Sequence, residues 1–160
     1  MEVEIVERNA FTAVGKKRTF SVENDAQKEK ISQFWQEANT NGDAERINEL
    51  AEFATIDGIL GVCQMNGDKM DYYIAIESEL TPPEDMEQLT IPASKWAIFQ
   101  SVGPLPNAIQ KVWEYIYGEW FQTSNYTHGN APELEVYTEG DTTAADYYSE
   151  VWIPVVEKDQ

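Results

Sequence analysis

A strand-like stretch near the C-terminus carries acidic and aromatic side chains at alternate positions. Glu133, Glu135 and Tyr137 alternate with Leu134 and Val136, and successive side chains of a strand point to opposite faces of its sheet. The spacing therefore places two carboxylates and a phenol on one face. A carboxylate among aromatic rings can neutralise a cation that stacks on those rings. With its pKa raised by apolar surroundings, the same carboxylate can act as a general base toward water.

Two further predicted strands separate an aliphatic face from a face with acids and rings. Tyr72, Ile74 and Ile76 alternate with Asp71, Tyr73, Ala75 and Glu77, and Val151, Ile153 and Val155 alternate with Glu150, Trp152 and Pro154. We expect the aliphatic faces of all three strands, including Leu134 and Val136, to pack on helices. In a curved sheet, the second faces then line a central cavity of rings around a carboxylate. The ligand-binding residues predicted on strands are Glu135, Tyr137, Glu150, Trp152, Tyr73 and Trp96.

The order of strand and helix signals that must position these residues occurs twice. Residues 2–79 and 86–157 each have the pattern strand, strand, helix, strand, strand, and the proline-rich stretch 81–85 joins them. Predicted strands cover 3–6, 11–20, 59–64, 70–77, 86–91, 95–102, 133–137 and 150–156, and predicted helices cover 25–39, 44–54 and 106–121. We therefore predict an α+β fold in one domain, residues 1–160. Two pseudosymmetric halves form a curved, largely antiparallel eight-stranded sheet with helices on one face. A single irregular α+β sheet without duplication is the alternative.

The charge balance excludes several classes of partner. The 160 residues include 29 acidic and 11 basic side chains, which gives a formal net charge of −18 at pH 7. Binding to phosphate groups needs clustered lysine and arginine, and the one basic cluster is 16–18. We therefore expect no direct binding to nucleic acid or to anionic membranes. The N-terminus lacks the basic and apolar regions of a signal peptide, and no apolar run approaches the roughly 18 residues of a membrane span, so the predicted location is the cytoplasm.

The sequence predicts no cofactor chemistry. It contains one cysteine, Cys63, and one histidine, His128, so no intrachain disulfide and no zinc-type ligand spacing is available. A glycine-rich phosphate loop is also missing. We therefore expect neither a metal nor a cofactor.

Several segments of the sequence resemble one known family. They are 91–99 (IPASKWAIF), 103–104 (GP), 112–117 (VWEYIY), Trp120, 124–126 (SNY), 134–137 (LEVY) and 150–155 (EVWIPV). Together they are similar to the GyrI-like small-molecule-binding domain, which also forms the effector-binding part of some AraC-type and MerR-type bacterial regulators. The resemblance implies a central aromatic pocket for lipophilic, often cationic compounds, with a buried glutamate that corresponds to Glu135. Trp113 and Tyr117 lie in the matching segments and complete the predicted ligand-binding set.

The resemblance leaves three functions open. The first is effector or multidrug binding, or sequestration, in which Glu135 neutralises a lipophilic, cationic or polarised aromatic ligand. The second is hydrolysis of the cyclopropane rings of genotoxic compounds, with Glu135 as general base and Tyr137 polarising the leaving oxygen. The third is an acidic modulator that binds gyrase. Because the strand pattern begins at Val3, we expect a stand-alone form without a fused DNA-binding domain.

Overall fold

The computed structural model describes residues 3–23 and 26–158, and its elements follow the predicted order. The first half contains β1 (Val3–Arg8), β2 (Phe11–Ser21), α1 (Ala26–Asn41), α2 (Asp43–Glu49), β3 (Ile59–Asn66) and β4 (Lys69–Glu77). The second half contains β5 (Glu87–Ile91), β6 (Ser94–Val102), α3 (Asn107–Tyr115), the π-helical turn η2 (Ile116–Trp120), α4 (Phe121–Thr123), β7 (Tyr126–His128), β8 (Glu133–Tyr137) and β9 (Tyr148–Glu157). The short strand β7 was not predicted, and α2 ends at Glu49 rather than at residue 54. Residue 25, the predicted start of the first helix, lies outside the described residues.

Local signals explain where several elements end. Gly42 has a φ of 88° between α1 and α2, a left-handed conformation that glycine adopts without steric strain. Gly67, with a φ of 66°, occupies the turn of the hairpin between β3 and β4, as the Asn66-Gly67 pair predicts. None of the helices in the described part of the chain is long and apolar enough to cross a membrane.

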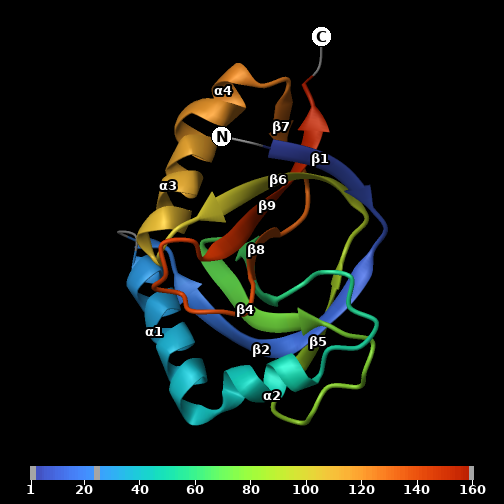
Figure 1. Ribbon diagram of the computed structural model, residues 1–160. Coiled ribbons are helices and arrows are strands. Elements are labelled where there is room, and N and C mark those ends of the chain that lie inside the picture. Colours follow the sequence, from blue (N-terminus) through green and yellow to red (C-terminus); the bar gives the residue numbers. More distant parts are fainter. Residues whose placement is uncertain (1–2, 24–25, 159–160) are drawn as a thin grey trace.

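The strands form one curved antiparallel sheet in the order β1-β6-β9-β8-β3-β4-β2-β5, and β7 adds a ninth strand beside β9 (Figure 1). The order is symmetric about the junction between β8 and β3, which joins the two halves. The first strand of each half is exchanged, because β1 pairs with β6 and β5 pairs with β2. The prediction of a curved sheet made from two similar halves is therefore confirmed.

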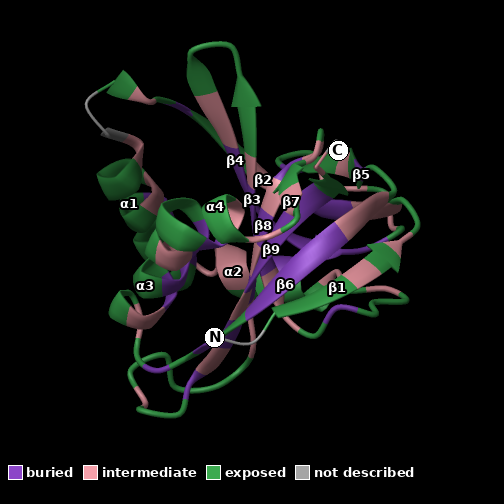
Figure 2. Cartoon of the chain, turned by 90° about the horizontal axis from the view of Figure 1, so that it is seen from above, coloured by how far each residue is buried: buried purple, intermediate pink, exposed green. Residues whose placement is uncertain are grey.

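The helices cover one face of the sheet, as predicted. Figure 2 shows α1 and α3 on the same side of the strands. Their apolar side chains form two buried clusters with the strands, which pack α1 and α2 on β2 and β4 and pack α3 on β6 and β9. Members include Phe34, Ile47, Ile74 and Ile76 in the first cluster and Ile109, Val112, Val151 and Ile153 in the second. The predicted packing of the aliphatic faces of β4 and β9 on helices is therefore confirmed.

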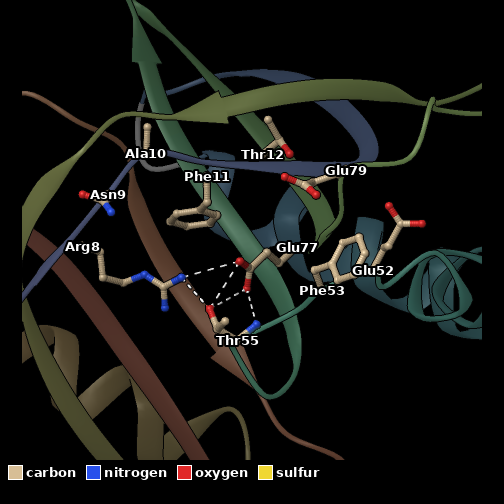
Figure 3. A pocket seen from close by; sticks show the side chains of 10 residues that line it. All are labelled: Arg8, Asn9, Ala10, Phe11, Thr12, Glu52, Phe53, Thr55, Glu77 and Glu79. Carbon is tan, nitrogen blue, oxygen red and sulfur yellow. Dashed lines mark hydrogen bonds and ion pairs between the residues drawn. The ribbon is translucent and has the colours of Figure 1, made fainter.

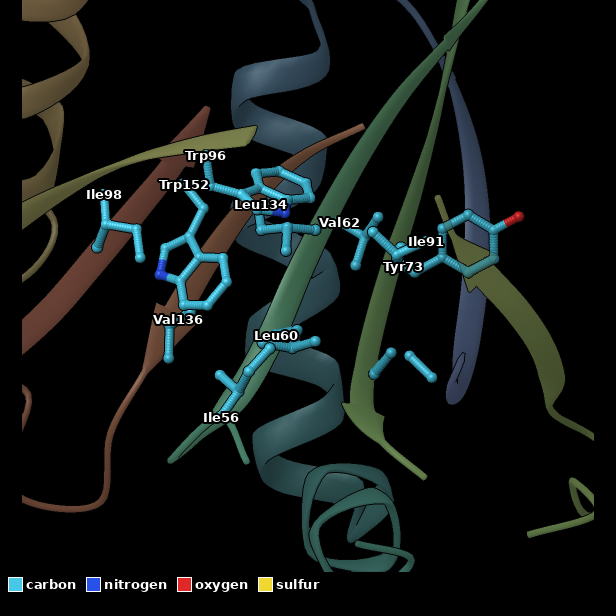
Figure 4. Close-up of a cluster of buried hydrophobic side chains, with 12 residues drawn as sticks. Ile56, Leu60, Val62, Tyr73, Ile91, Trp96, Ile98, Leu134, Val136 and Trp152 are labelled. Atoms are coloured by element: carbon cyan, nitrogen blue, oxygen red, sulfur yellow. The ribbon is translucent and has the colours of Figure 1, made fainter. Parts of the chain in front are cut away.

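The opposite face of the sheet is also buried, because the sheet curves around it (Figures 1 and 4). A third cluster contains Tyr73 of β4, Trp96 of β6 and Trp152 of β9, together with aliphatic side chains of β3 and β8. The ring centroids of Trp96 and Trp152 lie 5.8 Å apart, and none of the three aromatic residues is more than 9 % exposed. On this curved face, the rings therefore pack as hydrophobic core.

The prediction for the two faces of β8 is wrong. Glu135 pairs with Val151, and Leu134 pairs with Trp152. Directly paired residues share a face, so Glu135 lies on the helix-covered face. Leu134 and Val136 instead belong to the cluster on the curved face. Both faces of this sheet are buried. The aliphatic side chains of β8 therefore do not show which of its faces packs on the helices.

Candidate functional site

Glu135 is held on the helix-covered face of β8 by two aromatic hydrogen-bond donors. Nε1 of Trp113, in α3, donates to Oε2 of Glu135 over 2.9 Å. Oη of Tyr72, in β4, donates to Oε1 over 3.1 Å. Each carboxylate oxygen thus accepts a hydrogen bond from an aromatic side chain, and hydrogen bonds to an ionised acceptor are among the stronger ones. The two contacts fix the orientation of the carboxylate.

Trp35 of α1 extends this arrangement to the other helix. Its Nε1 donates to Oη of Tyr72 over 2.7 Å, and its ring meets the ring of Tyr137 edge-on, with centroids 5.1 Å apart. A phenol oxygen can accept one hydrogen bond and donate its own proton in another. Side chains from α1, β4, β8 and α3 therefore surround one carboxylate, that of Glu135.

A glycine in β3 makes room for these groups. Gly61 pairs with Glu135 of β8 and with Ile74 of β4. A Cβ atom at position 61 would lie 2.2 Å from Oη of Tyr72 and 3.0 Å from Oε1 of Glu135. An isolated glycine within a strand often marks such a close approach. Any larger side chain at this position would displace the tyrosine hydroxyl and press on the carboxylate.

The carboxyl group of Glu135 and the phenols of Tyr72 and Tyr137 have shifted pKa values. Burial raises the pKa of Glu135 above its ordinary value, and the hydrogen bonds from Trp113 and Tyr72 oppose this shift. Burial also raises the pKa of Tyr72 and of Tyr137, and the negative charge of Glu135 adds to both shifts. The two phenols therefore stay protonated and neutral.

Within the described part of the chain, the carboxylate of Glu135 has no positively charged partner. Across residues 3–23 and 26–158, no lysine, arginine or histidine forms an ion pair with this carboxylate. Glu135, Trp35 and Trp113 are partly exposed, and Tyr117 is 50 % exposed. A dissolved molecule can therefore approach an aromatic surface that lies beside an uncompensated carboxylate.

A second network leads from Trp113 to the protein surface. The rings of Trp113 and Tyr117 are stacked, with centroids 6.2 Å apart and an interplanar angle of 11°. The hydroxyl of Tyr117 donates to Oε2 of Glu133, and Nε2 of His128 lies 3.2 Å from the same oxygen. Nδ1 of His128 lies 2.6 Å from the carbonyl oxygen of Gly129. Both ring nitrogens face acceptors, so the protonated imidazolium, which has two N–H donors, satisfies both.

The hydrogen bond to Glu133 is the largest cause of the raised pKa of His128. We therefore expect Glu133→Gln to lower this pKa toward the ordinary value of about 6.5. Because the folded-state pKa is raised, the contact stabilises the fold fully below the unfolded-state pKa, and its contribution is lost as pH rises through the folded-state pKa. An NMR titration of the single histidine measures the change. Glu139→Gln, at an exposed position, is the control, and an equal pKa in all three proteins would contradict the assignment.

The sheet divides the predicted ligand-binding residues into two groups. Tyr137, Trp113 and Tyr117 lie on the helix side with Glu135, whereas Tyr73, Trp96, Glu150 and Trp152 lie on the curved face. Glu150 nevertheless has similar partners, because it accepts hydrogen bonds from Oη of Tyr148 at 2.5 Å and from Nε1 of Trp152 at 3.0 Å. Each face of the sheet therefore has a carboxylate that is held by one tyrosine and one tryptophan.

Three residues that contact Glu135 or its partners were not predicted from the sequence. Tyr72 and Trp35 occur among aliphatic residues on faces that pack as core, and Gly61 lies within the predicted strand 59–64 without a predicted role. Signals for all three exist in the sequence. A tyrosine or tryptophan on an otherwise aliphatic face usually needs a hydrogen-bond partner, and a glycine inside a strand indicates close approach of another group.

The sequence and the fold both match one family of domains. The family model for the GyrI-like small molecule binding domain matches residues 1–156. No curated protein matches the sequence. The structure of SAV2435 bound to tetraphenylphosphonium has 31 % sequence identity and a TM-score of 0.86 over 98 % of this chain and 94 % of that chain. A Staphylococcus aureus MU50 protein, described as a candidate bacterial transcription regulation protein, has 31 % identity and a TM-score of 0.85 over 97 % of this chain and 98 % of its own.

A more distant solved structure is similar in fold alone. A hydrolase from Listeria innocua has 10 % identity and a TM-score of 0.53, with 97 % of this chain and 92 % of that chain covered. At such an identity the likeness extends to the architecture, and it carries no information about the activity of this chain.

Proposed function

Because this chain belongs to the family of GyrI-like small-molecule binding domains, we propose that it binds lipophilic organic cations at Glu135. The family identifies the chain as a small-molecule-binding domain. The related SAV2435 structure holds tetraphenylphosphonium, a cation whose charge is surrounded by four phenyl rings. A carboxylate surrounded by aromatic side chains is chemically complementary to such a ligand.

The observation that carries the proposal is the uncompensated charge of Glu135 among aromatic rings. Its hydrogen bonds come from the neutral groups of Trp113 and Tyr72, which orient the carboxylate without neutralising it. A delocalised cation without N–H groups needs no free carboxylate oxygen. It is attracted by the negative charge at short range and by the faces of nearby rings, such as those of Trp113 and Tyr117.

The same contacts favour binding over hydrolysis as the role of Glu135. Each oxygen of Glu135 already accepts a hydrogen bond, from Tyr72 or from Trp113, whereas a general base needs an oxygen that can accept a proton from water. A countercharge acts through its negative charge and needs no such oxygen. We therefore assign Glu135 as the countercharge of the ligand, with Tyr137, Trp113 and Tyr117 as its aromatic surroundings.

Titration with tetraphenylphosphonium tests this proposal. Binding near Trp35 and Trp113 is expected to quench tryptophan fluorescence until one site is saturated. Triphenylphosphine oxide has phenyl rings but no net charge, and we expect it to bind at least about tenfold more weakly, because it gains neither the Coulomb nor the cation–π attraction. Equal affinity for the two compounds would contradict a role for the charge of Glu135. A lack of saturable binding by the cation would contradict the proposed function as a whole.

A further inference from the structure

A hollow lies beside the end of β4, away from Glu135, and Figure 3 shows the side chains that line it. Its volume is about 290 Å³, and it is lined by the turn after β1, the start of β2, the loop after α2 and the end of β4. Glu77 of β4 lines it and pairs with Ala13 of β2, a member of the cluster on the curved face. The hollow therefore lies beside that cluster, and the sheet separates it from Glu135.

At the base of the hollow, the carboxylate of Glu77 and the guanidinium of Arg8 pair with each other. Glu77 accepts hydrogen bonds from the backbone N–H groups of Thr55 and Ile56, at 2.8 and 3.0 Å, and forms an ion pair with Arg8 at 3.6 Å. The guanidinium of Arg8 also donates to Oγ1 of Thr55 over 2.7 Å and lies 4.9 Å from the ring centroid of Phe11. These contacts make the base rigid before any ligand arrives.

The rim of the hollow has groups without such partners. Glu52 and Glu79 line it, and within the described residues neither side chain takes part in an ion pair or hydrogen bond. Phe53, between them in Figure 3, is 79 % exposed and has a φ of 55°. With Glu77, the lining has three carboxylates against the one guanidinium of Arg8, so two negative charges are in excess.

We propose that this hollow is a second binding site, for small aromatic cations that carry N–H donors, such as amidines. The amidinium group would pair with Glu79 and Glu52, and the ring would lie against Phe53 and Phe11. The carboxylates of the two sites differ in how many of their lone pairs are free to accept hydrogen bonds from a ligand. Both oxygens of Glu135 already accept hydrogen bonds, whereas the rim carboxylates have free lone pairs that a planar N–H donor group can meet two at a time.

Isothermal titration calorimetry of the full chain with benzamidine tests the second site. We expect one saturable site for benzamidine. Replacing both rim carboxylates, Glu52→Gln with Glu79→Gln, is expected to lower the affinity by about fivefold or more. Glu84→Gln with Glu87→Gln changes the net charge equally at positions outside the hollow and is expected to leave the affinity unchanged. An equal loss in both double variants, or no loss in the first, would overturn the proposal.

Two further measurements test whether benzamidine binds at a site separate from Glu135 and whether the loop that carries Phe53 takes part in binding. Benzamidine is expected to bind the Glu135→Gln variant as it binds the parent, and saturating tetraphenylphosphonium should not displace it. Displacement would overturn the existence of a separate site. Phe53→Gly removes the ring and relieves the left-handed backbone, so Tm is expected to rise while the affinity for benzamidine falls. A rise in Tm with unchanged affinity would exclude Phe53 from the site and overturn the binding mode.

Discussion

Glu135→Gln is expected to weaken the binding of tetraphenylphosphonium about thirtyfold or more. Removing one partner of a buried charge pair costs about 2–5 kcal/mol, and about 1.4 kcal/mol changes a dissociation constant tenfold. Glutamine has nearly the same shape and can still accept a hydrogen bond from Trp113 or Tyr72, so the fold is expected to persist. Fluorescence titration measures the affinity, and circular dichroism with thermal unfolding checks the fold of both proteins.

Glu150→Gln is the matched control for this experiment. Glu150 also accepts hydrogen bonds from a tyrosine and a tryptophan, Tyr148 and Trp152, but it lies on the opposite face of the sheet. We expect its replacement to leave the affinity for tetraphenylphosphonium unchanged. If Glu150→Gln abolished binding and Glu135→Gln did not, the ligand would lie on the curved face instead.

The pH dependence of binding gives an independent test of Glu135. Burial raises the pKa of Glu135, and the cation binds the ionised form, so the affinity is expected to fall as pH decreases through this pKa. The stability of the fold without ligand is expected to increase as pH decreases over the same range. A raised folded-state pKa contributes stability that is fully present below the unfolded-state pKa and is lost as pH rises through the folded-state pKa. In Glu135→Gln both dependences should be absent over the same range, and a parent whose affinity did not change with pH would refute the assignment.

Gly61→Ala is expected to destabilise the fold and to abolish high-affinity binding together. The added Cβ would lie 2.2 Å from Oη of Tyr72 and 3.0 Å from Oε1 of Glu135, so the hydroxyl must move away and the carboxylate must shift. Overpacking of this kind costs about 1–3 kcal/mol, and the hydrogen bond from Tyr72 to the charged carboxylate is lost in addition. Urea unfolding and the tetraphenylphosphonium titration measure the two effects on the same samples.

A second substitution shows whether the hydroxyl of Tyr72 causes the loss of stability expected in Gly61→Ala. Tyr72→Phe removes the atom nearest to the new Cβ, so it should recover part of the stability lost in Gly61→Ala. Gly118→Ala, at an exposed position in η2 with no atom within 4 Å of the added Cβ, is the matched control. It is expected to raise stability by up to about 1 kcal/mol and to leave binding unchanged. If Tyr72→Phe recovered nothing, another contact of Gly61 would cause the loss.

The sequence predicted the architecture well because the alternation typical of strands and the three-and-four spacing typical of helices are both strong in it. Burial against a neighbouring layer sets both patterns. They are the alternation of apolar residues in β4 and β9 and the spacing of Ile109, Val112 and Ile116 in α3 and η2. The short strand β7 was missed because its three residues, Tyr126–His128, are too few to show a period. These elements depend on local pattern, and local pattern is visible in a single sequence.

The site could be predicted only in part because face assignment depends on strand pairing. Glu135 and Tyr137 were identified as ligand-binding residues, but Leu134 and Val136 were expected to face the helices. Only the pairing of Leu134 with Trp152 reveals that they face the other way. That pairing joins strands separated by a long loop, and no pattern within β8 specifies it. The partners Tyr72 and Trp35 depend on long-range packing for the same reason.

The exchange of β1 and β5 between the halves makes folding a property of the whole chain. Val3 pairs with Phe99, and Phe11 pairs with Ile91, so each half completes its sheet with a strand from the other. Such pairs close long loops, which slows folding and leaves little native structure to form before the second half exists. The β8–β3 junction, where Glu135 faces Gly61, joins the same two halves. A ligand that binds there therefore stabilises both halves together against cooperative unfolding.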